Sequence, residues 1–136
     1  MTPSELARDA KRVAVLGAHT DPTRPAHYVP AYLHAQGVEL WPVNAANVGQ
    51  TLWGKPVAAT LAELQTPIDV VDVFRRPDAL MDHLDDLLAM SPLPKCVWLQ
   101  SGIRNDAFAQ ALEARGVTVV QDRCMMVEHR LATPKP

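Results

Sequence analysis

A chain of 136 residues can bury the core of one domain without disulfides or a structural metal. Its net charge of -2 gives no general attraction for nucleic acid or an acidic membrane surface, and no apolar run approaches the roughly 20 residues of a membrane span. The two cysteines lack the spacing of a zinc site or a disulfide scaffold, which favours a cytoplasmic location.

Predicted helices and strands alternate along the chain. In order, they are a helix over 3–10, a strand over 12–16, a helix over 25–36, a strand over 38–43, a loop over 45–55, a short helix over 60–64, a strand over 69–74, a helix over 77–90, a strand over 96–99, a helix over 105–115, a strand over 117–121 and a helix over 125–131. This alternation is typical of repeated βαβ units. It predicts an α/β fold, a Rossmann-like three-layer sandwich whose five-stranded parallel sheet has the order 3-2-1-4-5.

We expect one domain over residues 1–136, with a core at about 10–131 and a frayed tail from Thr133 onward. Ser4 is placed to cap the first helix. Pro30 lies inside the second helix and lacks a backbone donor, so we expect a first turn that is bent or 3₁₀-like.

A glycine stands at the turn from the first strand into the second helix. The apolar run Val13 to Leu16 ends at Gly17, and a polar loop leads to a helix that begins at Pro25. A helix N-terminus presents unpaired N–H groups and a partial positive charge, and glycine lets the backbone approach an anion closely. Arg24 adds a full positive charge there. The pattern predicts a phosphate site.

In parallel α/β sheets the ligand lies beyond the carboxyl ends of the strands, here expected near the switch between strands one and four. The loops at these ends cover residues 17–24, 43–47, 74–77, 100–104 and 122–124. The cations in or near these loops are Arg24, Arg75, Arg76, Arg104, Arg123 and, as a further candidate, Lys55. So many cations in a slightly acidic protein indicate a ligand with several phosphates.

A dinucleotide-binding fingerprint is missing. The loop after the first strand has one glycine, Gly17, and the strand over 38–43 ends at Asn44 rather than at an acid for the ribose hydroxyls. No G-x-S-x-G turn and no paired carboxylates stand at the strand ends. We therefore expect a non-catalytic binding protein without metal, and keep an NAD-dependent oxidoreductase or a nucleotide-sensing regulatory domain as alternatives.

Five loop motifs, taken together, resemble those of small bacterial CoA-binding proteins. They are Gly17-Ala18, Pro42-Val43-Asn44, the run from Asp72 to Asp78, the run from Val97 to Ile103, and Asp122-Arg123-Cys124-Met125. These proteins are stand-alone relatives of the CoA-binding domain in the succinyl-CoA synthetase α subunit, and the resemblance covers nearly the whole chain. It implies that coenzyme A or an acyl-CoA is the ligand, and that this small molecule is the partner rather than nucleic acid or membrane.

The resemblance also implies a role for each loop. Gly17, Ala18, His19 and Thr20 would wrap the CoA pyrophosphate, Val43 and Asn44 would lie along the adenosine, Phe74, Arg75 and Arg76 would border the nucleotide, and Gln100, Ser101 and Gly102 would lie near the pantetheine. Arg24 completes the predicted set.

Cys124 follows the last predicted strand, on the ligand side of the sheet. The neighbouring Arg123 and the start of a helix would favour its thiolate. We hypothesise a mixed disulfide between Cys124 and the CoA thiol; the alternative is a buried structural cysteine. Trp41, Trp53 and Trp98 are expected to serve packing.

Overall fold

The structure is a computed structural model, and it describes residues 1–133. A parallel sheet of five strands forms its centre. The strands are β1 (Arg12–Leu16), β2 (Glu39–Val43), β5 (Val70–Val73), β6 (Cys96–Leu99) and β7 (Thr118–Val120). The predicted α/β class with a parallel sheet is therefore confirmed.

The predicted strand order is wrong. The sheet runs β2-β1-β5-β6-β7, so the five strands have the order 2-1-3-4-5 rather than 3-2-1-4-5. Strand β2 lies at the edge because Pro42 has no N–H for a second neighbour, and proline in a sheet is confined to edges and bulges. Strand β5, by contrast, is buried at all its residues and lies between β1 and β6. Pro42 was the signal in the sequence that β2 lies at an edge.

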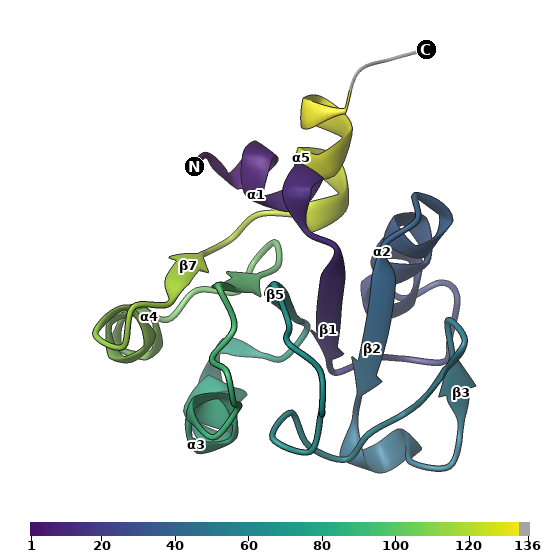
Figure 1. The fold of residues 1–136 in the computed structure, drawn as a ribbon, viewed down its shortest axis with the longest axis horizontal. Helices are drawn as coiled ribbons and strands as arrows, with labels where there is room; N and C mark the ends of the chain where they lie inside the picture. The colour runs from purple at the N-terminus through teal and green to yellow at the C-terminus, as the bar shows by residue number, and fades with distance from the viewer. Residues whose placement is uncertain (134–136) are drawn as a thin grey trace.

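Helices cover both faces of the sheet (Figure 1). One face packs against α1 (Pro3–Asp9), α2 (Pro25–Ala35) and α5 (Met125–Ala132); the other packs against η2 (Pro77–His83), α3 (Leu84–Leu88) and α4 (Asp106–Glu113). Strand side chains alternate between these two cores: Val15 and Trp98 face the first, Leu16 and Leu99 the second. This places three layers around the sheet, as predicted.

Several local predictions need correction. The helix predicted over 60–64 is a turn, in which the Asp86 carboxylate accepts the N–H groups of Leu61 and Ala62, at 2.7 and 3.0 Å. The loop predicted over 45–55 contains η1 (Ala45–Asn47) and a small antiparallel pair, β3 (Thr51–Leu52) and β4 (Lys55–Pro56). The helix predicted over 77–90 is 3₁₀ in its first half, η2, and α-helical in α3.

The two ends of the described chain lie side by side. Thr2, not Ser4, caps α1, and the Ser4 hydroxyl donates instead to Glu128 of α5 at 2.6 Å. Thr133, predicted as frayed, donates its N–H to His129 O at 3.0 Å. The rest of that predicted tail, 134–136, lies outside the described residues.

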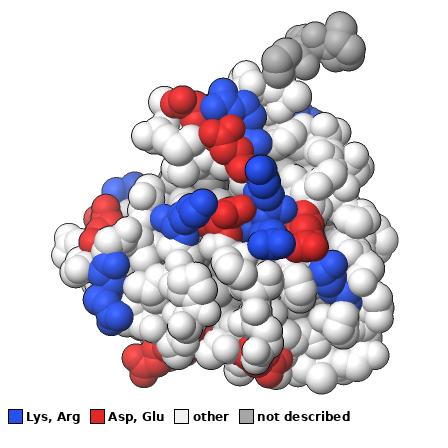
Figure 2. Space-filling view, in the orientation of Figure 1, with Lys and Arg blue, Asp and Glu red and all other residues white. Residues whose placement is uncertain are grey.

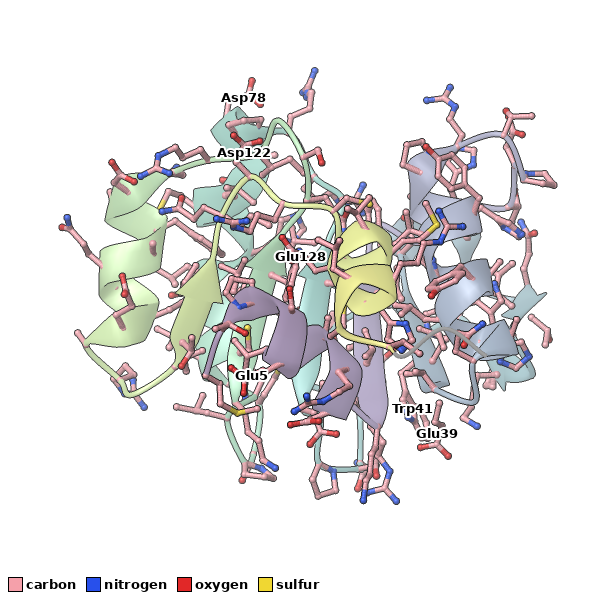
Figure 3. All side chains as sticks on the ribbon, turned by 90° about the horizontal axis from the view of Figure 1, so that it is seen from above. Glu5, Glu39, Trp41, Asp78, Asp122 and Glu128 are labelled. Carbon is pink, nitrogen blue, oxygen red and sulfur yellow. The ribbon has the colours of Figure 1, made fainter. Side chains whose placement is uncertain are left out.

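The amino ends of the strands carry paired charges. Glu39 pairs with Arg12 and Lys55, and Asp69 with Lys95. On the face drawn in Figure 2, acidic and basic side chains are interleaved. Figure 3 places Glu39 at one end of the molecule and Asp78 and Asp122 at the other. In the part of the chain described, no helix is long and apolar enough to cross a bilayer, and no three metal-binding side chains gather.

Candidate functional site

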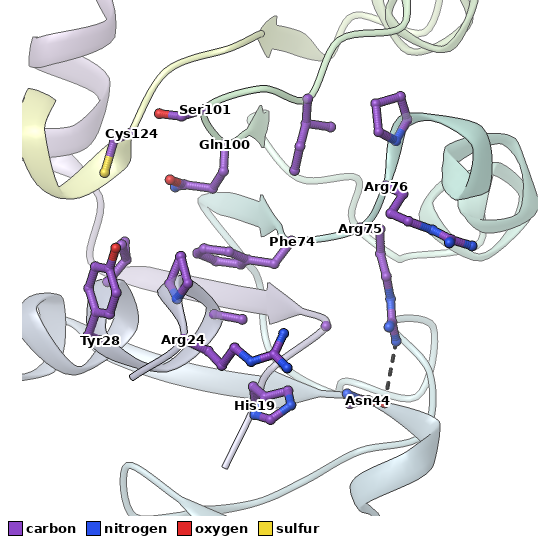
Figure 4. Close-up of a pocket in the computed structure, with 16 residues that line it drawn as sticks. His19, Arg24, Tyr28, Asn44, Phe74, Arg75, Arg76, Gln100, Ser101 and Cys124 are labelled. Atoms are coloured by element: carbon purple, nitrogen blue, oxygen red, sulfur yellow. Dashed lines mark hydrogen bonds between the residues drawn. The ribbon is translucent and has the colours of Figure 1, made fainter. Parts of the chain in front are cut away.

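A pocket of about 490 Å³ opens at the carboxyl ends of the strands (Figure 4). Its size is typical of small-molecule sites. The loops after β1, β2, β5 and β6 and the start of α5 form its walls. The chain runs from β1 to β2 on one side of β1, and from β5 to β6 on the opposite side of β5. The switch point therefore lies between β1 and β5, not between strands one and four as predicted.

The pocket brings together most of the predicted ligand residues. Those that line it are Gly17, His19, Arg24, Asn44, Phe74, Arg75, Arg76, Gln100 and Ser101. Ala18, Thr20, Val43 and Gly102 do not line it. Ala18 and Val43 are fully buried, Thr20 is exposed, and the Gly102 N–H donates to the Asp122 carboxylate at 2.6 Å.

Gly17 lets two strand ends meet closely. Its φ is +91°, and a Cβ added there would lie 2.6 Å from the carbonyl oxygen of Phe74. Glycine alone fits this backbone without a clash. The Gly17 N–H donates to Val43 O at 2.9 Å, so the same residue also joins the β1 end to β2.

The loop after Gly17 is held by its own backbone donors. Ala18 N–H donates to Val43 O, and His19 N–H donates to Ala26 O, each at 3.3 Å. Ala26 O is available because Pro30, four residues on, has no N–H. Helix α2 is α-helical from Pro25 onward with Pro30 inside it, which corrects the predicted 3₁₀-like first turn. These amides therefore hold the loop, whereas the Ala26 N–H, at the pocket wall, has no acceptor within residues 1–133.

His19 presents one ring nitrogen as a donor. Its Nδ1 accepts the Asp21 N–H at 3.0 Å, so the proton of the neutral ring lies on Nε2. His27, in α2, donates a hydrogen bond from its Nδ1 to the backbone oxygen of His19 at 2.8 Å. Because His19 lines the pocket, its Nε2–H is a candidate donor to an anionic ligand.

Two of the pocket cations have no acidic partner in residues 1–133. Arg24, at the N-cap of α2, and Arg75 form no ion pair there, whereas Arg76 pairs with Asp78 at 3.5 Å. Arg75 donates to the side-chain oxygen of Asn44 at 3.3 Å, while its Nε is buried without a partner. A buried donor of this kind fits an anionic oxygen, so the residues present suit a phosphate group.

Asn44 has a structural role beside any contact with a ligand. Its side-chain N–H donates to Ala18 O at 2.9 Å, and its oxygen accepts from Ala46 N–H and from Arg75. Asn44 thus ties the loop after β1 to an arginine of the loop after β5.

The other predicted cations lie away from the pocket. Arg104 pairs with Asp106, Arg123 with Glu128 and Lys55 with Glu39. The pocket is therefore electrostatically divided. Its cations belong to α2 and to the loop after β5, while the loop after β6 and the start of α5 contribute Gln100, Ser101, Ile103 and Cys124.

The predicted site residues omit six that line the pocket: Pro25, Ala26, Tyr28, Val29, Pro77 and Ile103. Of these, Pro77 and Ile103 lie in the predicted loops 74–77 and 100–104, whereas the other four belong to α2. The spacing of Pro25, Tyr28 and Val29 was the available signal, because residues three and four apart share one helix face.

Cys124 lines the pocket and is half-buried. Its neighbour Arg123, one of the two features expected to favour its thiolate, donates to Glu128 at 2.9 Å. The other cysteine, Cys96, is fully buried, and burial raises the pKa of its thiol to about 12. The three tryptophans do not line the pocket; Trp98 is buried, and its indole N–H donates to Arg123 O at 2.7 Å.

Comparison with known proteins adds an independent finding. A family model described as "CoA binding domain" matches residues 11–130. Uncharacterized protein YneT of Bacillus subtilis (strain 168) is 34% identical over 125 residues, which cover 92% of this chain and 90% of that protein.

Two solved structures extend the comparison. Cell-free ID.343 from Thermus thermophilus has a TM-score of 0.91 and 51% identity, over 98% of this chain and all of that one. The dinucleotide forming acetyl-coenzyme A synthetase 1 of Ca. Korarchaeum cryptofilum shares the fold over 87% of this chain and 27% of that chain, with a TM-score of 0.70 and 18% identity.

Proposed function

This chain belongs to the CoA binding domain family, and we propose that it binds coenzyme A or an acyl-CoA in the pocket at the β1/β5 switch, without catalysing a reaction. One observation carries the proposal: two arginines without acidic partners in residues 1–133, Arg24 and Arg75, line a pocket to which the loop after β6 and the start of α5 contribute no cationic lining residue. This division suits a ligand with phosphates at one end and an uncharged arm at the other.

The same division suggests how the ligand lies. The phosphates contact Arg75, Arg24 and the Nε2–H of His19, and the nucleotide lies along Asn44 and Phe74. The pantetheine arm extends toward Gln100, with the thiol at the α5 side of the pocket. A non-catalytic role is supported by His19, whose Nδ1 accepts a backbone N–H rather than activating a hydroxyl or thiol.

A thermal-shift panel tests this function. A ligand that binds only the folded state stabilises it by RT ln(1 + [L]/Kd), about 2.7 kcal/mol at one hundred times Kd. We expect a rise in Tm with CoA, a smaller rise with dephospho-CoA, which lacks one phosphate, and little change with NAD. A larger shift with NAD would contradict the proposal and favour an oxidoreductase.

Arg75→Ala should weaken CoA binding by roughly ten- to a hundredfold, the range for a lost hydrogen bond to a charged group. Adding Arg76→Ala should change little more, because Arg76 is exposed and pairs with Asp78. The affinity that remains should also depend less on salt. Titration calorimetry at two salt concentrations measures both effects.

Arg104→Ala, whose charge pairs with Asp106 outside the pocket, is the matched control. Equal losses in Arg75→Ala and Arg104→Ala would remove Arg75 from the site.

Cys124 offers a test of where the thiol end lies. With the disulfide of CoA as reagent, the Cys124 thiolate attacks one sulfur, forms a protein–CoA disulfide and releases one CoA thiol. Intact mass should show one CoA moiety per chain, absent in Cys124→Ser and retained in Cys96→Ser, because Cys96 is fully buried. An adduct that survives Cys124→Ser would contradict this placement.

A further inference from the structure

An acidic side chain lies buried beneath the pocket floor. Asp72, in the interior strand β5, is fully buried and shares its face of the sheet with Val15, Trp98 and Cys96. Its Oδ1 accepts a hydrogen bond from the Gln100 side-chain N–H at 2.6 Å, and its Oδ2 has no partner within residues 1–133. Burial without a cation raises the pKa of Asp72 to about 7. A buried carboxyl without a paired cation destabilises the fold, so a functional role would explain its presence here.

Gln100 connects this acid to the pocket. It follows β6, is 5% exposed and lines the pocket wall. A glutamine amide has a donor side, the NH₂ group, and an acceptor side, the oxygen. The ionised carboxylate of Asp72 can only accept, and its Oδ1 accepts from Nε2, so the oxygen Oε1 of Gln100 is left for the pocket. An asparagine at position 72 would leave the choice open, because it could face Gln100 with either its oxygen or its NH₂ group.

The location of Gln100 Oε1 in the pocket indicates which part of a ligand it contacts. Gln100 belongs to the β6 side of the pocket, whereas Arg24 and Arg75 belong to α2 and the loop after β5. An acceptor that cannot donate repels phosphate oxygens and suits an N–H donor on an uncharged group. The amide N–H groups of a pantetheine-type arm are donors of this kind.

We propose that Asp72 is a positioning residue, which fixes the amide of Gln100 so that Oε1 accepts a hydrogen bond from an amide N–H of the ligand's uncharged arm. The inference rests on the proposed function, because it assigns one specific contact of CoA binding. It makes Gln100 a selector for nucleotides that carry an amide-bearing arm over those that end at the phosphates.

Titration calorimetry with two ligands at pH 8, where Asp72 is ionised and can only accept, tests the inference. One is reduced CoA; the other is 3′-phospho-ADP, which keeps the adenosine and phosphates of CoA and lacks the arm. Gln100→Met removes the acceptor and should weaken CoA about tenfold while changing 3′-phospho-ADP less than twofold. Asp72→Leu removes the group that orients Gln100 and should weaken CoA about fivefold, again with 3′-phospho-ADP unchanged.

Cys96→Ala is the control, because Cys96 is buried beside Asp72 on the same face and does not line the pocket. It should leave both affinities unchanged.

If Asp72→Leu does not fold, Gln100→Met by itself tests the contact with the ligand. Asp72→Asn, which keeps the shape of the side chain, then tests the orientation of Gln100, and it should weaken CoA less than fivefold. Equal losses for the two ligands, or no loss in Gln100→Met, would overturn the inference. The inference would also be overturned if the wild-type protein bound CoA no more tightly than 3′-phospho-ADP. If the wild-type protein bound neither ligand, the proposed function itself would be overturned.

Discussion

Gly17→Ala should abolish measurable CoA binding and lower the free energy of unfolding by about 3 kcal/mol or more. Left-handed backbone costs a non-glycine residue about 1–2 kcal/mol. The added Cβ would also lie 2.6 Å from Phe74 O, a backbone atom that cannot move unless the ends of β1 and β5 separate. That separation would displace Phe74 and Arg75, which line the pocket.

Urea unfolding measures the stability loss, and Gly37→Ala supplies the control. Gly37 has the same φ of +91°, but nothing lies within 4 Å of an added Cβ. Its alanine variant should therefore show only the conformational cost and should retain CoA binding. Losses of equal size in the two variants would mean that the contact between Gly17 and Phe74 does not constrain the fold.

The second large effect concerns Asp72 and pH. The pKa of this carboxyl is raised from 3.8 to about 7 in the folded protein by burial. Between these values the folded state holds a proton that the unfolded state has released, so the free energy of unfolding falls as pH rises through this window. At about 1.4 kcal/mol per pH unit, the loss approaches about 4 kcal/mol by pH 7.

Asp72→Asn has no proton to release at this position. From pH 4 to pH 8, its free energy of unfolding should improve relative to the wild type by up to about 4 kcal/mol, and most of that change should occur below pH 7. Urea unfolding at several pH values gives the difference curve, in which titrations common to both proteins cancel. The neighbouring Cys96 adds nothing, because its thiol stays protonated across this range. Parallel curves for the two proteins would show that Asp72 titrates normally in the fold.

Some features of the fold and the site follow from local sequence. Unbroken apolar runs such as Val13 to Leu16 predict buried parallel strands, because a strand covered on both faces has no polar side. Gly17 predicts the turn into α2, since left-handed backbone favours glycine. Parallel strands bring their carboxyl ends to one edge, and so the loops that form the pocket could be predicted without knowing the strand order.

Other features depend on which segments become neighbours. Pro42 indicates an edge position for β2, but the place of β5 between β1 and β6 is decided only in the assembled sheet. Asn44 is a second example, because its side chain contacts Ala18 of the loop after β1 and Arg75 of the loop after β5.

By itself, the sequence determined the class of fold, the edge of the sheet where ligand residues collect and the glycine turn, because each depends on side chains close together in the chain. The tertiary structure alone decided the strand order, the contacts that tie Asn44 to Ala18 and Arg75, and the hydrogen bond from Gln100 to Asp72. These depend on contacts between residues far apart in sequence, such as Asp72 with Gln100, whose distance and orientation are set by packing.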